Sequence, residues 1–231
     1  MGDRDKLMAT GLRQKSTAPA FAVGDVSRKP QQGRSKASLE RMLAAGRELM
    51  LERGSEEFTL QEVSERGQVS IGSIYLRFES KDNLVRGVIA EALEVLASDE
   101  DALLEQLKSD CRDLASFVPA YVAGYAEVLR RHAPLLRLTM ERAATDPQVS
   151  APGKEHALRA EADSVAAMLV HAAEFGGTDH KVKAQSSFHI IFATLARQLS
   201  LGSSGEAAHD YDWSLLKREL ARMCLAYFRA D

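Results

Sequence analysis

The chain has 231 residues, of which 45% are hydrophobic and 27% charged, and its net charge at pH 7 is −3. This length allows one large or two small domains with a real core, and the slightly negative charge gives no sign of a nucleic-acid partner by itself. No apolar run approaches the roughly 18 residues of a membrane span and the N-terminus lacks the apolar segment of a signal peptide, so we expect a soluble, cytoplasmic protein.

Residues 1–35 are rich in Gly, Pro, Ser, Gln and cations, and they show no apolar period. This composition predicts a disordered, basic N-terminal arm. Such an arm either contacts DNA or is a vector-derived extension, and the sequence leaves both open. Between Met1 and Lys36 the acidic residues are Asp3, Asp5 and Asp25. The basic residues of the same segment outnumber them and are Arg4, Lys6, Arg13, Lys15, Arg28, Lys29, Arg34 and Lys36.

A helical pattern begins at Ser38 and ends at Gly54, which follows a cation in the last turn. Its apolar stripe consists of Leu39, Met42, Leu43, Gly46, Leu49 and Met50. These positions recur at i, i+3, i+4 and i+7, which is the spacing of one helix face.

Two short helices are expected next. Thr59 and Glu62 have the spacing of a capping box, and Phe58 and Val63 flank them as a hydrophobic staple. Gly67 ends this helix after two turns. Two short capped helices joined by a tight turn form a helix-turn-helix, in which the second helix enters the DNA major groove.

The second of these helices is capped by Ser70, with Val69 and Ile74 again placed as a staple. Its N-terminal end carries the small residues Ser70, Gly72 and Ser73, which let the backbone approach a duplex closely. Ser73 and Tyr75 can donate to phosphate oxygens, whereas Arg77 could contact either a guanine or a phosphate.

Ser80 is the cap of the following helix and places Lys81 in its first turn. Free backbone N–H groups, the positive dipole end and a lysine together predict a phosphate clamp. The alternative for the whole segment is a helical hairpin inside a larger bundle. That arrangement would bury Tyr75 as an ordinary aromatic and leave Lys81 as a solvated charge.

The rest of the chain shows no strand alternation and predicts an all-α protein of about nine helices, with a three-helix head and a larger helical body. The expected domains are a 1–35 arm, a 36–84 DNA-binding head and an 85–231 body for ligand binding and dimerisation. The expected separators are Pro134, residues 145–153 with two prolines, Gly176-Gly177 and residues 202–212. The helices expected between them are 81–107, 112–131, 134–144, 154–175, 180–201 and 213–229.

Residues 38–84 resemble the DNA-binding head of the TetR family of transcriptional regulators (tetracycline-repressor type). The matching features are a first helix ending at Gly54, Thr59-Leu-x-x-Val, Val69-Ser-x-Gly-Ser-Ile-Tyr-x-x-Phe78, and Ser80-Lys81-x-x-Leu84. The resemblance implies phosphate contacts from Thr59, Tyr75 and Lys81, and base or phosphate contacts from Ser70 to Ser73.

Three residues depart from the family pattern. Gln68 stands where the turn glycine is usual, so the turn geometry is expected to shift slightly. Ile71 replaces a residue that is commonly polar or basic, and Arg77 replaces a frequent histidine. We expect these departures to alter the operator rather than the fold.

The resemblance also implies a body that dimerises through its last two helices and holds an apolar ligand pocket. One apolar stripe in 180–201 contains Phe188, Ile191, Phe192, Leu195 and Leu199, and one in 213–229 contains Leu216, Leu220, Met223, Cys224 and Tyr227. A partner subunit or the monomer's own core could cover them. The candidate pocket residues are Phe117, Tyr121, Tyr125, Leu136, Met140, Met168, His171, Phe175, His189 and Phe192.

No phosphate-binding Gly-rich loop, nucleophile elbow, HExxH or CxxC occurs in the sequence, so we expect no enzyme, no metal site and no cofactor. Cys111 and Cys224 are expected to be free thiols. The hypothesis is a homodimeric repressor that binds a (pseudo)palindromic operator and is released by a small, largely apolar effector. Two alternatives stay open: a constitutive DNA-binding protein without a pocket, and a helical interaction module or enzyme whose head packs instead of binding DNA.

Overall fold

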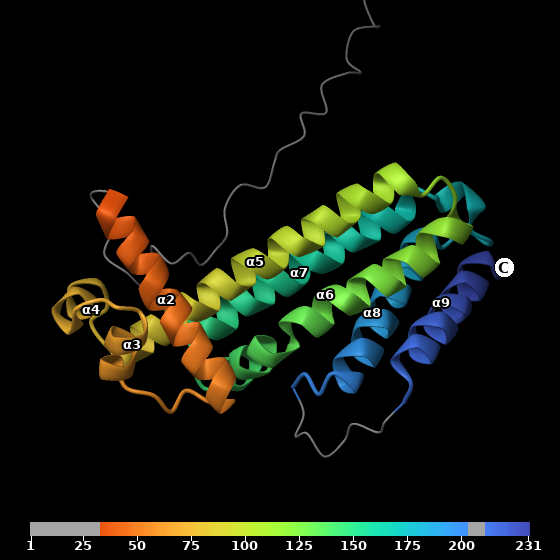
Figure 1. Ribbon diagram of the computed structural model, residues 1–231. Coiled ribbons are helices and arrows are strands. Elements are labelled where there is room, and N and C mark those ends of the chain that lie inside the picture. The colour runs from red at the N-terminus through yellow and green to blue at the C-terminus, as the bar shows by residue number, and fades with distance from the viewer. Residues whose placement is uncertain (1–32, 203–210) are drawn as a thin grey trace, which may run out of the picture.

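The computed structural model describes residues 33–202 and 211–231, and the described residues form eight α-helices, one 3₁₀ turn and no strand (Figure 1). The expected all-α class is therefore confirmed. Most of the expected N-terminal arm lies outside the described residues, as does most of the loop expected over 202–212. Of the helices described, none is long and apolar enough to cross a membrane.

The head is formed by α2 (Gly33–Arg53), α3 (Leu60–Arg66) and α4 (Ile71–Arg77), packed on the first turns of α5 (Lys81–Asp110). Helix α2 begins at Gly33, which is five residues before the expected start at Ser38. The core of the head is apolar and almost fully buried. Its members include Met42, Leu43, Leu49, Met50, Phe58, Val63, Ile74, Phe78, Leu84 and Val88.

The body consists of α5, α6 (Leu114–Ala143), α7 (Pro147–Leu169), α8 (His180–Gln198) and α9 (Trp213–Arg229), with a 3₁₀ turn at Ala172–Glu174. Figure 1 shows α5 running from the head along the length of the body, so that one helix belongs to both parts. Helices α8 and α9 lie at the opposite side of the body, near the C-terminus. The body core is built from apolar residues of all five helices.

The expected break at Pro134 is wrong, and the expected break over 145–153 is shorter than predicted, since α7 continues through Pro152. Helix α6 runs through Pro134, and α7 begins at Pro147, which is its first residue after the Asp146 cap. A proline inside a helix removes one backbone hydrogen bond and would usually break the helix. Pro134 is exposed, whereas its neighbours Ala133 and Leu135 are buried. Burial of these neighbours against the rest of the protein keeps the helix continuous, which a local pattern does not reveal.

Candidate nucleic-acid interface

Three consecutive helix starts in the head have the caps that the sequence predicts. The Thr59 hydroxyl oxygen accepts from the Glu62 N–H at 3.2 Å, and the Glu62 carboxylate accepts from the Thr59 N–H at 2.7 Å. Ser70 caps α4 through the N–H of Ser73 at 3.1 Å, and Ser80 caps α5 in the same way. These caps fix where each short helix begins, and so they set the direction of α4 relative to α3.

In the turn between α3 and α4, two different residues provide the close packing and the left-handed backbone conformation that one glycine usually provides. Gln68 has φ 50°, the left-handed region that favours glycine, whereas Gly67 has φ −77°. A Cβ at Gly67 would lie 3.0 Å from the carbonyl oxygens of Arg41 and Val63. Gly67 therefore permits close packing of α3 on α2, while Gln68 makes the reversal.

Helix α4 turns one face into the head core and the other to solvent. Ile74 and Phe78 are fully buried, whereas Tyr75 is 57% and Leu76 68% exposed. Ser70 and Gly72 are exposed as well, and nothing lies within 4 Å of the position of a Cβ at Gly72. The alternative of a buried hairpin required a buried Tyr75, and the structure excludes it.

The predicted phosphate contacts Lys81 and Thr59 already have partners within the head. The Lys81 ammonium donates to the carbonyl of Glu56 at 2.7 Å and lies 5.1 Å from the centre of the Phe58 ring. An ammonium has three N–H groups, so others stay available to a phosphate. The Thr59 hydroxyl donates to the Glu62 carboxylate at 2.9 Å.

Glu62 is also paired with Arg53, on the last turn of α2. The hydrogen bond from Arg53 and those from Thr59 lower the pKa of Glu62 to about 2. The carboxylate is therefore charged at every physiological pH, and it competes with a DNA phosphate for the Thr59 proton. Of the predicted phosphate contacts, the exposed Tyr75 hydroxyl has the clearest path to a duplex.

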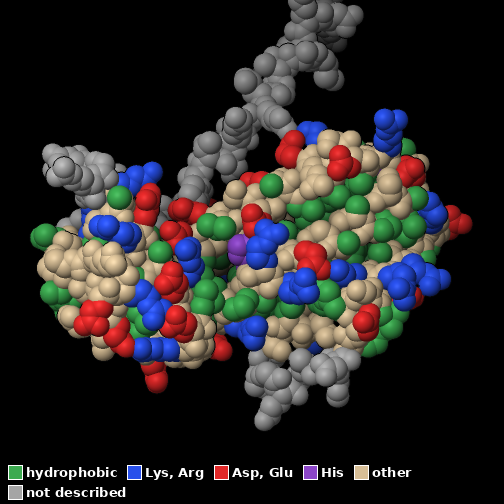
Figure 2. All heavy atoms as spheres, in the orientation of Figure 1, with side chains coloured by type: hydrophobic (Ala, Val, Ile, Leu, Met, Phe, Trp, Pro, Cys, Tyr) green, Lys and Arg blue, Asp and Glu red, His purple; other side chains and the backbone are tan. Residues whose placement is uncertain are grey.

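Acidic and basic side chains are interspersed on the head, as Figure 2 shows for one face. From Lys36 to Arg86 the sequence contains eight Lys or Arg and nine Asp or Glu residues. Strong phosphate attraction therefore does not come from the net charge of the head.

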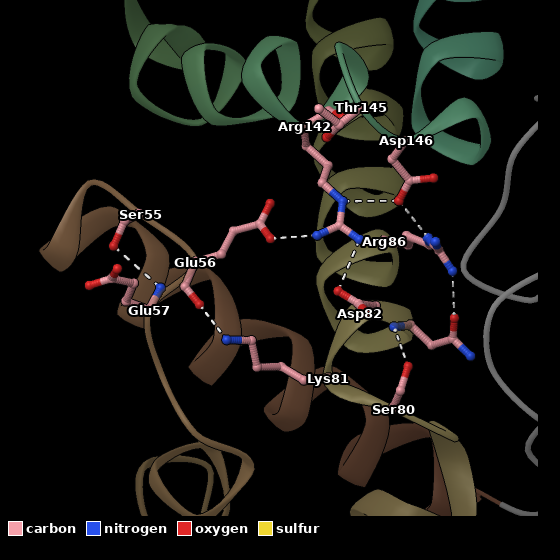
Figure 3. Close-up of polar contacts among 11 residues, drawn as sticks. Ser55, Glu56, Glu57, Ser80, Lys81, Asp82, Arg86, Arg142, Thr145 and Asp146 are labelled. Atoms are coloured by element: carbon pink, nitrogen blue, oxygen red, sulfur yellow. Dashed lines mark hydrogen bonds and ion pairs between the residues drawn. The ribbon is translucent and has the colours of Figure 1, made fainter.

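A cluster of charged groups joins the head to the body (Figure 3). Arg142, on the last turn of α6, contacts Glu56 at 2.8 Å, Asp82 at 3.0 Å and Asp146 at 2.9 Å. Arg86 of α5 lies 2.8 Å from the same Asp146 oxygen. We call these five residues the junction cluster. Sequence reasoning missed it, because its head and body members are far apart along the chain.

Two members of the junction cluster, Asp146 and Arg142, have shifted pKa values. Burial would raise the pKa of Asp146, whose side chain is 5% exposed, but hydrogen bonds from Arg86 and Arg142 outweigh burial and lower this pKa. The pKa of Arg142 is raised: its burial acts in the opposite direction, but the hydrogen bonds to Asp146 and Asp82 prevail. Both shifts favour the charged forms of Asp146 and Arg142.

The body contains a cavity of about 550 Å³, bounded by α5, α6, α7 and α8 and lined mostly by apolar side chains. Tyr125, Met140 and Phe192, together with Leu136 and His189, line it as the sequence analysis expected. The other five candidates do not line it. Phe117, Tyr121, Met168 and Phe175 are buried in the body core, and the His171 ring lies 4.9 Å from that of Phe117.

Most of the cavity wall, 17 of its 22 residues, comes from residues that sequence reasoning missed. Helix α5 contributes Leu93, Leu96 and Glu100, and α7 contributes His156 and Glu161 among others. The apolar members fit an ordinary core stripe, so no local signal distinguishes them. No group of His, Cys, Asp or Glu suited to a metal ion occurs in the described parts of the chain.

An exposed helix-turn-helix on a helical body defines the chain as a DNA-binding regulatory protein. Residues 42–88 match the family model described as bacterial regulatory proteins of the tetR family. Residues 42–88 therefore form a DNA-binding head of the TetR type. No curated protein matches the sequence.

Solved structures agree in fold. A putative TetR-family transcriptional regulator from Mesorhizobium loti is 15% identical with a TM-score of 0.70, and the match covers 85% of this chain and 97% of that one. A transcriptional regulator from Cytophaga hutchinsonii is 18% identical over 83% and 98%, with a TM-score of 0.62. The fatty acid degradation regulator FadR from Bacillus halodurans is 15% identical over 80% and 97%, with a TM-score of 0.58. At these identities the likeness concerns the fold alone.

Proposed function

We propose that this protein is a cytoplasmic, homodimeric repressor that binds a (pseudo)palindromic operator and releases it when a small effector enters the body cavity. The role is regulatory and non-catalytic. The observation that carries the proposal is the position of the cavity: its wall includes Met140, Ala143 and Ala144, which flank Arg142 of the junction cluster.

On the DNA side, α4 enters the major groove with its N-terminal end toward the bases. Ser70, Gly72, Ser73 and Arg77 provide base or phosphate contacts there. Thr59, Tyr75 and Lys81 contact phosphates and fix the register. The exposure of Tyr75 and of the Gly72 backbone supports this arrangement.

The dimer forms through α8 and α9. Apolar side chains face solvent on both helices of the single chain: Val182 is 55% and Ile190 48% exposed on α8, and Met223 is 65% and Tyr227 38% exposed on α9. Other residues of the predicted stripes, such as Phe188 and Leu220, are buried within the chain itself. A two-fold dimer would place the two α4 helices about 34–36 Å apart, to match successive major grooves.

The effector acts through the end of α6. A ligand that displaces Met140 and Ala143 also displaces Arg142, which holds Glu56, and the Glu56 carbonyl accepts the Lys81 hydrogen bond. A ligand that binds one junction geometry better than the other shifts the population between them and thereby changes operator affinity.

The test is to select bound sites from random duplex and to titrate the selected duplex at two salt concentrations. We expect affinity to fall steeply as salt rises, because phosphate contacts release counterions. The absence of duplex binding, or binding that does not change with salt, would contradict the proposal. The alternative of a constitutive DNA-binding protein is less favoured because its body would lack a cavity, whereas this body contains one of about 550 Å³.

A further inference from the structure

A nearly buried carboxylate belongs to the wall of the cavity, where an unpaired charge is unfavourable. Glu100 of α5 is 7% exposed and contributes to the cavity wall. Its Oε2 atom has no hydrogen-bond partner within the described part of the chain, although His156 Nε2 lies 3.3 Å away. A buried carboxylate is stabilised by a cation and by hydrogen bonds, and here the protein supplies only part of them.

We propose that the effector is an apolar molecule carrying a protonated amine, and that its ammonium group pairs with Glu100. This inference rests on the proposed function, because it assumes that the cavity is the effector site. It adds the chemical class of the effector, which neither the fold nor the family determines.

The other charges of the cavity wall support a cationic ligand. Glu161 is a second carboxylate, and its oxygen lies 3.4 Å from Nε2 of the exposed His189. Lys154 is the lysine of the wall, and it is exposed. A ligand carboxylate placed beside Glu100 would face a like charge, whereas an ammonium would face an opposite one.

The shape and composition of the cavity specify the rest of the ligand. The Tyr125 and Phe188 rings lie 6.1 Å apart, and the Phe188 and Phe192 rings stack at 6.2 Å. Leucines of α5 and α6 complete this wall. Aromatic faces attract cations and also pack against apolar groups, and the volume is in the range of small-molecule sites. An aromatic or alicyclic amine meets all of these conditions.

The test compares three probes with one skeleton, 3,3-diphenylpropylamine, 3,3-diphenylpropanol and 3,3-diphenylpropanoate, by calorimetric titration into the full-length protein. We expect the amine to bind at least about tenfold more tightly than the alcohol, and the carboxylate to bind least. Glu100→Gln keeps the side-chain shape and removes the charge. It should reduce amine affinity about tenfold or more and leave alcohol affinity unchanged.

Glu161→Gln is the matched control, since the Glu161 side chain is 21% exposed against 9% for Glu100, and a smaller loss of amine affinity is expected. The melting temperature of Glu100→Gln should not fall, as it would if the carboxylate were held for structure. Equal binding of amine and alcohol, no binding of the amine, or an amine affinity unaffected by Glu100→Gln would overturn the inference. Failure to bind duplex DNA would instead overturn the proposed function and leave the amine result standing.

Discussion

Gln68 carries the backbone conformation that reverses the chain between α3 and α4. Its φ of 50° lies in a region that is unfavourable for residues with a Cβ. Gln68→Gly should therefore raise the free energy of unfolding by about 1 kcal/mol, less the entropy that a glycine adds to the unfolded chain. Urea denaturation measures the change, and a loss of stability would show that the glutamine side chain itself holds the turn.

A substitution at Gly72 should affect the stability of the fold and the affinity for DNA in opposite directions. A Cβ at this exposed position in α4 meets nothing within 4 Å, so Gly72→Ala should stabilise the helix by about 0.5–1 kcal/mol. The same methyl group would stand between the α4 backbone and a duplex. We therefore expect operator affinity to fall while thermal stability rises, as measured by fluorescence anisotropy and calorimetry. If affinity is unchanged, Gly72 does not face DNA.

At the scale of the element, α6 keeps a proline at an exposed position between buried neighbours. Pro134→Ala restores one backbone N–H and a good helix former, so the free energy of unfolding should rise by about 1–3 kcal/mol. Denaturant titration gives this value, and Ala157→Pro, at an exposed position of α7, should have the opposite sign. A destabilised Pro134→Ala protein would mean that the bend at the proline is required by the packing of α6.

The end of α6 also carries the junction cluster, whose stability depends on pH. Because the pKa of Asp146 is lowered in the folded state, its contribution is present above the unfolded pKa and is lost as pH falls through the folded pKa. Arg142→Met should reduce stability at pH 7 by about 2 kcal/mol, since Asp146 then keeps only Arg86 among its two arginines.

Arg142→Met should lose less stability than the wild type when the pH is lowered from 5 toward 2, because the pKa of Asp146 is lowered less in this variant. Thermal melts across that range test the sign. Equal acid sensitivity in the two proteins would show that the cluster contributes little. Arg142→Met should also weaken the effect of an effector on operator binding, because it removes the contact between α6 and Glu56.

At the scale of the whole molecule, the proposed dimer requires two α4 helices at a fixed separation. Met223→Glu places a charge on the exposed apolar face of α9, and it should convert the dimer to a monomer and lower operator affinity at least about tenfold. Light scattering after size exclusion reports the mass. Val95→Glu, on the exposed side of α5, is the matched control and should leave the dimer intact. A dimeric Met223→Glu protein would exclude this part of α9 from the interface.

The sequence by itself determined the head. Each of the caps at Thr59, Ser70 and Ser80 is a contact between residues three apart, and the glycine stop after α2 is equally local. Such contacts join residues that are close together in the sequence. The helix-turn-helix and its exposed face can therefore be predicted from the local pattern alone. The predicted range 213–229 also agrees with the bounds of α9, whose start is capped by Asp212 through the N–H of Leu215.

Only the tertiary structure decided where the cavity lies and how it meets the head. Arg142 and Glu56 are 86 residues apart, and Arg86 and Asp146 are 60 apart, so no local period relates them. The same holds for Glu100, which fits a solvated helix face until α7 covers it. The apolar residues of α5 to α8 could all belong to a filled core, and whether a space remains among them depends on how the helices pack, which is a property of their joint arrangement rather than of any one segment.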